Sequence, residues 1–127
     1  MQVVSVAPNS TAAVLAQNQF NKPPAAGDQF FIARVRTTFI GQGSSRLGHL
    51  GRFRALGPAG VSYTQFDTSA NCGVIPDEIT ENEAFSGGTI EGNICWEVRS
   101  PDAGSLLMFD SPIGSDPAKR VWYRLTP

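Results

Sequence analysis

The chain has 127 residues, 41% of them apolar and 17% charged, with a formal net charge of -1 at pH 7. This length suits a single domain spanning residues 1–127, and the apolar fraction is sufficient for a packed core. The near-neutral charge argues against a dedicated nucleic-acid binder, which usually carries a large positive excess. No apolar run approaches the roughly 18 residues of a membrane-spanning helix, so no transmembrane segment is predicted.

The first residues, Met1–Val6, lack the basic and apolar regions of a signal peptide. Two interpretations follow. The protein is cytosolic, or it is an exported domain whose leader and linker lie outside this chain.

The N-terminal part of the chain predicts a strand, a short helix and a long strand. The strand is Val3–Val6, at the edge of a sheet, and a polar residue followed by helix formers predicts the helix near residues 10–17. Two prolines, Pro23 and Pro24, then exclude helix. In the long strand Gln29–Ile40, alternate residues form one apolar face: Phe31, Ala33, Val35, Thr37 and Phe39.

The C-terminal half repeats this alternation in Thr89–Val98, where Trp96 faces the predicted core and Cys95 faces away from it. Shorter strands are predicted at Val61–Phe66, Ser105–Phe109 and Val121–Leu125. The set predicts an all-β protein, an antiparallel β-sandwich with one short N-terminal helix. A closed barrel is the alternative, because strand number alone does not separate the two.

Two cysteines, Cys72 and Cys95, are 23 positions apart and show neither CxxC nor Cys/His ligand spacing. The one histidine in the chain is too few to complete a zinc site, and no metal or other cofactor is expected. The pair is interpreted as a disulfide of an exported domain in preference to two unrelated buried thiols. Such a bond would hold the preceding loop against the outside of a sheet.

Charge is unevenly distributed along the chain. Residues 29–66 contain five arginines and no acid, whereas residues 67–98 contain seven acids and no base. The arginines could bind an anion or an acidic glycan, because guanidinium groups pair well with carboxylates and sulfates. The favoured alternative is that the basic and acidic strands pair across a sheet.

Exposed aromatic residues are the remaining clue to binding. Phe30 and Ile32 share a strand face with Arg34 and Arg36, and Trp122 points away from its neighbours in the last strand. A patch of this composition suits a protein partner or a sugar ring. The alternative is that the short helix or the Cys72 loop covers the Phe30 face. Arg34, Arg36 and Trp122 are the predicted contact residues.

Three patterns could be taken for a phosphate-binding loop, a calcium site or a hydrolase triad, but each lacks a feature that such a site needs. The loop Gly41–Arg46 lacks the lysine of a phosphate-binding loop, and no helix pattern follows it. The acidic stretch 77–83 offers oxygens for calcium but not the ligand order of an EF-hand, so a solvated loop is favoured. A hydrolase triad of His49 with Ser44 or Ser45 and Asp67 has no GxSxG motif around its serine. No catalytic residue is therefore predicted.

Two separated segments resemble a known family. One is NQFNKPPAAGDQF at residues 18–30, which leads into the long strand. The other is GGTIEGNICWEV at residues 87–98, preceded by Cys72 and the acidic Pro76–Glu78. Together they resemble small exported or lipid-anchored bacterial domains of unknown function, similar in fold to a secreted mycobacterial immunogenic antigen. The resemblance implies an immunoglobulin-like β-sandwich located outside the cytoplasm, and it implies no catalytic residues.

These observations lead to one expected function and two alternatives. The expected function is a non-enzymatic binding module of the bacterial cell envelope, secreted or anchored through a segment outside this chain. Its partner would be a protein or a glycan at the cell surface, and not a nucleic acid. The first alternative is a carbohydrate- or anion-binding domain. The second is a small hydrolase, for which turnover would be lost in His49→Ala.

Overall fold

The computed structural model describes residues 1–46, 52–65, 72–80, 82–111 and 114–126. The predicted β-rich class with one short N-terminal helix is confirmed. None of the described helices is long and apolar enough to cross a membrane. In chain order the elements are β1 (Gln2–Ala7), α1 (Thr11–Gln17), β2 (Asp28–Thr38), β3 (Ser44–Arg46), β4 (Phe53–Leu56), β5 (Ser62–Tyr63), β6 (Glu83–Phe85), β7 (Thr89–Arg99), the 3-10 turn η1 (Ser100–Asp102), β8 (Leu106–Asp110), the 3-10 turn η2 (Pro117–Lys119) and β9 (Trp122–Leu125).

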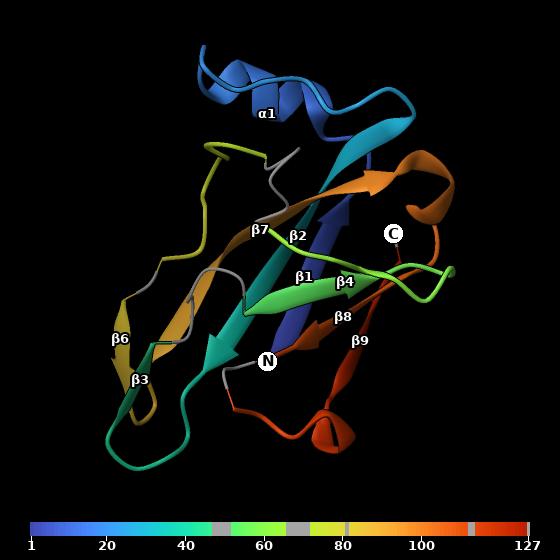
Figure 1. The fold of residues 1–127 in the computed structure, drawn as a ribbon. Helices are drawn as coiled ribbons and strands as arrows, with labels where there is room; N and C mark the ends of the chain where they lie inside the picture. The colour runs from blue at the N-terminus through green and yellow to red at the C-terminus, as the bar shows by residue number, and fades with distance from the viewer. Residues whose placement is uncertain (47–51, 66–71, 81, 112–113, 127) are drawn as a thin grey trace.

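The described strands form three antiparallel sheets. One has the order β1-β2-β7, the second β5-β4-β8-β9, and the third contains only β3 and β6. β2 and β7 are the longest strands and pair along their whole length, from Asp28↔Arg99 to Thr38↔Thr89. Figure 1 shows α1 near the beginning of β2, and the small β3-β6 sheet near its other end.

The main core cluster contains side chains from both large sheets. Phe31, Ala33 and Val35 come from β2, as their alternation predicts, and β4, β8 and β9 contribute from the other sheet. Trp96 of β7 is fully buried, and its Nε1 donates a hydrogen bond to the Phe53 carbonyl oxygen at 3.2 Å. The bond satisfies the one polar group of this large side chain and joins β7 to β4.

A second cluster lies on the other face of β2 and β7. Because strand side chains alternate, Phe30 and Ile32 point away from the main core, and so does Cys95. They pack with Val14 of α1 and with Cys72 and Ile75, which lie between β5 and β6 in the segment called here the Cys72 loop. The structure confirms that the helix and the Cys72 loop cover this face.

Two connections hold the Cys72 loop to this face. A disulfide joins Cys72 to Cys95, with the two Cα atoms 6.2 Å apart, as the sequence predicted. Asn21, which follows α1, donates from Nδ2 to the carbonyl oxygens of Val14 and Val74 and accepts from the Val74 N–H. The disulfide indicates an oxidising setting for the protein.

The structure corrects several sequence expectations. β3, β4 and β6 were not predicted, and β3 lies within Gly41–Arg46, which was predicted to be a loop. The long strand ends at Thr38, so Phe39 is not part of the main core. Ser10 precedes α1 without capping it, because its hydroxyl donates to the Ala7 carbonyl oxygen instead. Residue Phe66, at the end of the predicted Val61–Phe66 strand, lies outside the described residues.

Candidate binding surfaces

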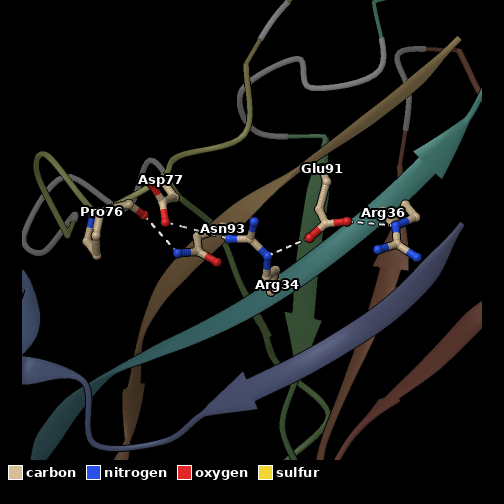
Figure 2. A network of polar contacts seen from close by, with 6 residues as sticks. All are labelled: Arg34, Arg36, Pro76, Asp77, Glu91 and Asn93. Carbon is tan, nitrogen blue, oxygen red and sulfur yellow. Dashed lines mark hydrogen bonds and ion pairs between the residues drawn. The ribbon is translucent and has the colours of Figure 1, made fainter.

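Arg34 and Arg36 lie on the outer face of β2 and share one carboxylate on β7. The Nε of Arg34 is 2.7 Å from Oε1 of Glu91, and the Nε of Arg36 is 2.6 Å from Oε2 (Figure 2). The strand register places Arg36 directly opposite Glu91, with Arg34 one pleat away on the same face. The predicted pairing of basic and acidic strands is therefore confirmed for these two arginines.

The same network continues to the chain segment beside β7. Arg34 also lies 3.8 Å from Asp77, and Asn93 donates from Nδ2 to the Pro76 carbonyl oxygen (Figure 2). The backbone N–H of Asn93 bonds to the Asp77 carbonyl oxygen at 2.8 Å, so the segment runs along the strand edge. Gly92 permits this approach, because a Cβ there would lie 2.7 Å from the Ile79 backbone nitrogen.

The two arginines lower the pKa of Glu91 below its ordinary value of 4.5, first through the hydrogen bond from Arg34 and then through that from Arg36. A carboxylate whose pKa is lowered by folding stabilises the folded state above its unfolded pKa. That contribution is lost as the pH falls through the lowered pKa. Arg34, Arg36 and Glu91 therefore link β2 to β7, and this link weakens as the pH falls through the lowered pKa of Glu91.

Glu91→Gln is expected to lower the unfolding midpoint at pH 7, with the difference from the unmodified chain shrinking below pH 4.5. The effect is small because the pair lies at the surface, where the partly exposed Glu91 carboxylate is screened by solvent. Urea unfolding at pH 7 and about pH 3 measures it. A difference that stays constant between these pH values would contradict the role assigned to Glu91.

A second surface, the outer face of β4, β8 and β9, has a different composition. We call its aromatic and basic residues, together with the adjacent Arg120, the arginine–aromatic face: Arg54, Phe109, Arg120, Trp122 and Arg124. The same side of the sheet also carries Leu56 and Leu107. Arg54, Phe109 and Trp122 form one row across the three strands. Trp122 packs on Phe109 with ring centroids 4.9 Å apart, and the Arg120 guanidinium lies 4.6 Å from the Phe109 ring centroid.

These contacts bury Phe109 but leave Trp122 open to solvent. Phe109 is 3% exposed, whereas Trp122 is 46% exposed. Phe109 thus forms a fixed base on which an exposed indole ring is held. An exposed tryptophan in a defined position is typical of a contact residue in a binding surface.

The arginines of this face differ from Arg34 and Arg36 in their charge environment. Within the described part of the chain, no carboxylate lies within ion-pair distance of Arg54, Arg120 or Arg124. The Nε of Arg54 and that of Arg120 are buried and have no hydrogen-bond partner there either. The nearby Asp110 instead forms a bidentate ion pair with Arg52. Among the described residues, the face therefore carries uncompensated positive charge.

Two cavities lined by described residues lie near the strands of this sheet. One of about 320 Å³ borders the arginine–aromatic face and is lined by Asp110, Ser115, Asp116, Lys119, Arg120, Val121 and Tyr123. The other, of about 290 Å³, lies at Tyr63, whose hydroxyl donates to the buried Asp102 at 2.5 Å. Burial and then the Asp102 hydrogen bond raise the pKa of Tyr63. This bond joins β5 to the η1 turn.

The structure does not bring the three predicted contact residues together. Arg34 and Arg36 point outward from one sheet and Trp122 points outward from the other, with the main core between them. Their role in contacts stays a prediction. The neighbours of Trp122 on this face were not predicted: Arg54, Phe109, Arg120 and Arg124. The shared parity of Trp122 and Arg124 was the one local signal for this face.

The other candidate chemistry falls partly on residues that the structure does not describe. His49 and Asp67 of the possible triad lie outside the described residues, as does Glu81 of the acidic stretch. In that stretch Asp77 pairs with Arg34, and Glu83 accepts a hydrogen bond from Ser44. Among the residues described, no three His, Cys, Asp or Glu side chains gather closely enough to hold a metal ion.

Comparison with known proteins adds no assignment. The chain matches no family model, no curated protein and no solved structure at a significant level.

Proposed function

We propose that this chain is a non-enzymatic binding module of the bacterial cell envelope that works outside the cytoplasm through its arginine–aromatic face. The observation that carries the proposal is the exposed Trp122, which is held on Phe109 and shares its sheet face with arginines that have no carboxylate partner among the described residues. Exposed aromatic and arginine side chains contribute strongly to binding energy when a partner covers them.

The disulfide supports the extracytoplasmic part of the proposal. Disulfides persist in secreted and envelope proteins and are rare in the reducing cytosol. The Cys72–Cys95 bond connects a loop to β7 in a way that would be lost in a reducing compartment. We further propose that the protein is secreted, or anchored through a segment outside this chain.

The two large sheets support a proposed immunoglobulin-like β-sandwich. Inward-facing residues of β2 and β7 share the main core cluster with those of β4, β8 and β9, as expected for two packed sheets. The helix and the Cys72 loop cover part of the outer face of one sheet, whereas the arginine–aromatic face lies on the outer face of the other sheet. The resemblance of residues 18–30 and 87–98 to exported bacterial domains is consistent with this fold.

Sedimentation with isolated bacterial cell walls tests the proposal. The purified chain is expected to sediment with the walls, and Trp122→Ala is expected to weaken this binding about tenfold, because it removes the exposed contact residue. Phe85→Ala is the matched control, since Phe85 is an exposed aromatic residue on β6, away from this face. Equal sedimentation of the two variants, or none by the unmodified chain, would contradict the proposal.

A further inference from the structure

We infer that the arginine–aromatic face binds an acidic glycan, a chain of sugar units that carry carboxylate groups. This inference rests on the proposed function and specifies the chemistry of its ligand. It follows from the combination, on one sheet face, of an exposed indole ring with guanidinium groups that no described carboxylate neutralises.

The positive charge of the arginine–aromatic face favours an anionic ligand. The whole chain has a net charge of -1, yet Arg54, Arg120 and Arg124 gather on a face whose described strand residues include no acid. Asp110, at the end of β8, is already paired with Arg52. A guanidinium without a partner gains most from a carboxylate, which accepts two parallel hydrogen bonds from it.

The shape of the face favours a sugar chain over an acidic peptide. Peptides commonly bind by adding a strand to a free sheet edge or by filling a groove. Trp122 and Arg124 lie on the edge strand β9, but Arg54 and Phe109 lie on β4 and β8, which are both paired on each side within the sheet. A peptide strand added beside β9 would therefore not cover Arg54 and Phe109. The cavity bordering this face lies beside Arg120 and Tyr123 and not across the exposed Trp122. A broad ring such as Trp122 offers a flat apolar surface to the C–H face of a sugar.

The extent of the face suits several linked sugar units. Arg54 and Trp122 are in the same row but two strands apart, which corresponds to about 10 Å across the sheet. Arg124 follows Trp122 on the same face of β9, one pleat further along. A chain that stacks one ring on Trp122 would therefore bring carboxylates of its neighbouring rings within reach of the long side chain of Arg54, across the sheet, or of Arg124, along β9.

Tryptophan fluorescence gives a direct readout, because the chain has two tryptophans and only Trp122 is exposed. The full chain is titrated with a galacturonic acid oligomer, and iodide quenching of the emission is followed. We expect the oligomer to protect the emission from iodide. The Trp122→Phe variant, which keeps only the buried Trp96, gives the background emission that iodide does not reach. Arg124→Gln should weaken binding about tenfold through loss of a charge-assisted contact. Arg36→Gln, which removes the same charge from the opposite sheet, should leave binding unchanged.

Two comparison ligands make the test specific. The methyl-esterified oligomer keeps the rings and loses the charge, and poly-glutamate keeps carboxylates without sugar rings. Binding of either one as tight as that of the acidic oligomer would overturn the inference. If the unmodified chain sediments with cell walls but does not bind the oligomer, the glycan assignment alone is overturned. If it does neither, the proposed function is overturned as well.

Discussion

Reduction of the Cys72–Cys95 disulfide is expected to lower the free energy of unfolding by about 3 kcal/mol. The bond joins residues 23 positions apart, and this is the size of effect that the chain-entropy account gives for such a loop. It also holds Cys72 and Ile75 within the second cluster on the outer face of β2 and β7. Urea unfolding with and without a reductant measures the difference.

The double variant Cys72→Ala/Cys95→Ala distinguishes the effect of losing the disulfide from other effects of the reductant on stability. It should unfold at the same urea concentration as the reduced chain and should not respond to added reductant. Intact mass after alkylation of the denatured, non-reduced chain from exporting cells should show no alkyl group. Two alkyl groups would contradict the extracytoplasmic proposal, and an unfolding midpoint that reduction leaves unchanged would contradict the stabilising role of the bond.

Replacement of Trp96 by alanine is expected to destabilise the protein by about 4 kcal/mol, the usual cost of removing a large buried aromatic side chain. Trp96 is fully buried in the main core cluster, and its removal also leaves the Phe53 carbonyl oxygen without its donor. The free energy of unfolding is measured by circular dichroism in urea, so that the loss of a fluorophore does not affect the readout.

Two variants control this experiment. Trp96→Phe keeps most of the ring and loses the hydrogen bond, so it should cost about 1–2 kcal/mol and remain folded if the alanine variant does not. Trp122→Ala removes the same kind of side chain from an exposed position and should cost about 1 kcal/mol or less. A Trp96→Ala variant as stable as Trp122→Ala would contradict the placement of the core.

The alternation of side chains in the long strands made the two faces of β2 and β7 predictable. Trp96 and Cys95 are adjacent in sequence, and period-two geometry alone places them in different clusters. The charge asymmetry likewise predicted that arginines of one strand would meet acids of another. The particular partner, Glu91, required the register of β2 against β7, which no local pattern specifies.

The short strands and the arginine–aromatic face could not be predicted in this way. β4 and β6 have four and three residues, too few for a periodic signal to emerge. The row of Arg54, Phe109 and Trp122 forms only after three strands distant in sequence pair in one register. The sequence therefore indicated that Trp122 points outward but not which residues lie beside it, and the other two predicted contact residues, Arg34 and Arg36, lie on the opposite sheet.

Cell-wall sedimentation of two charge-matched double variants tests the account most directly. Arg54→Gln/Arg124→Gln and Arg34→Gln/Arg36→Gln remove the same charge from opposite sheets, and the second pair already shares the Glu91 carboxylate. We expect the first variant to lose binding by at least about tenfold and the second to bind like the unmodified chain. Equal binding by both variants, or loss only in Arg34→Gln/Arg36→Gln, would contradict the assignment of function to the arginine–aromatic face.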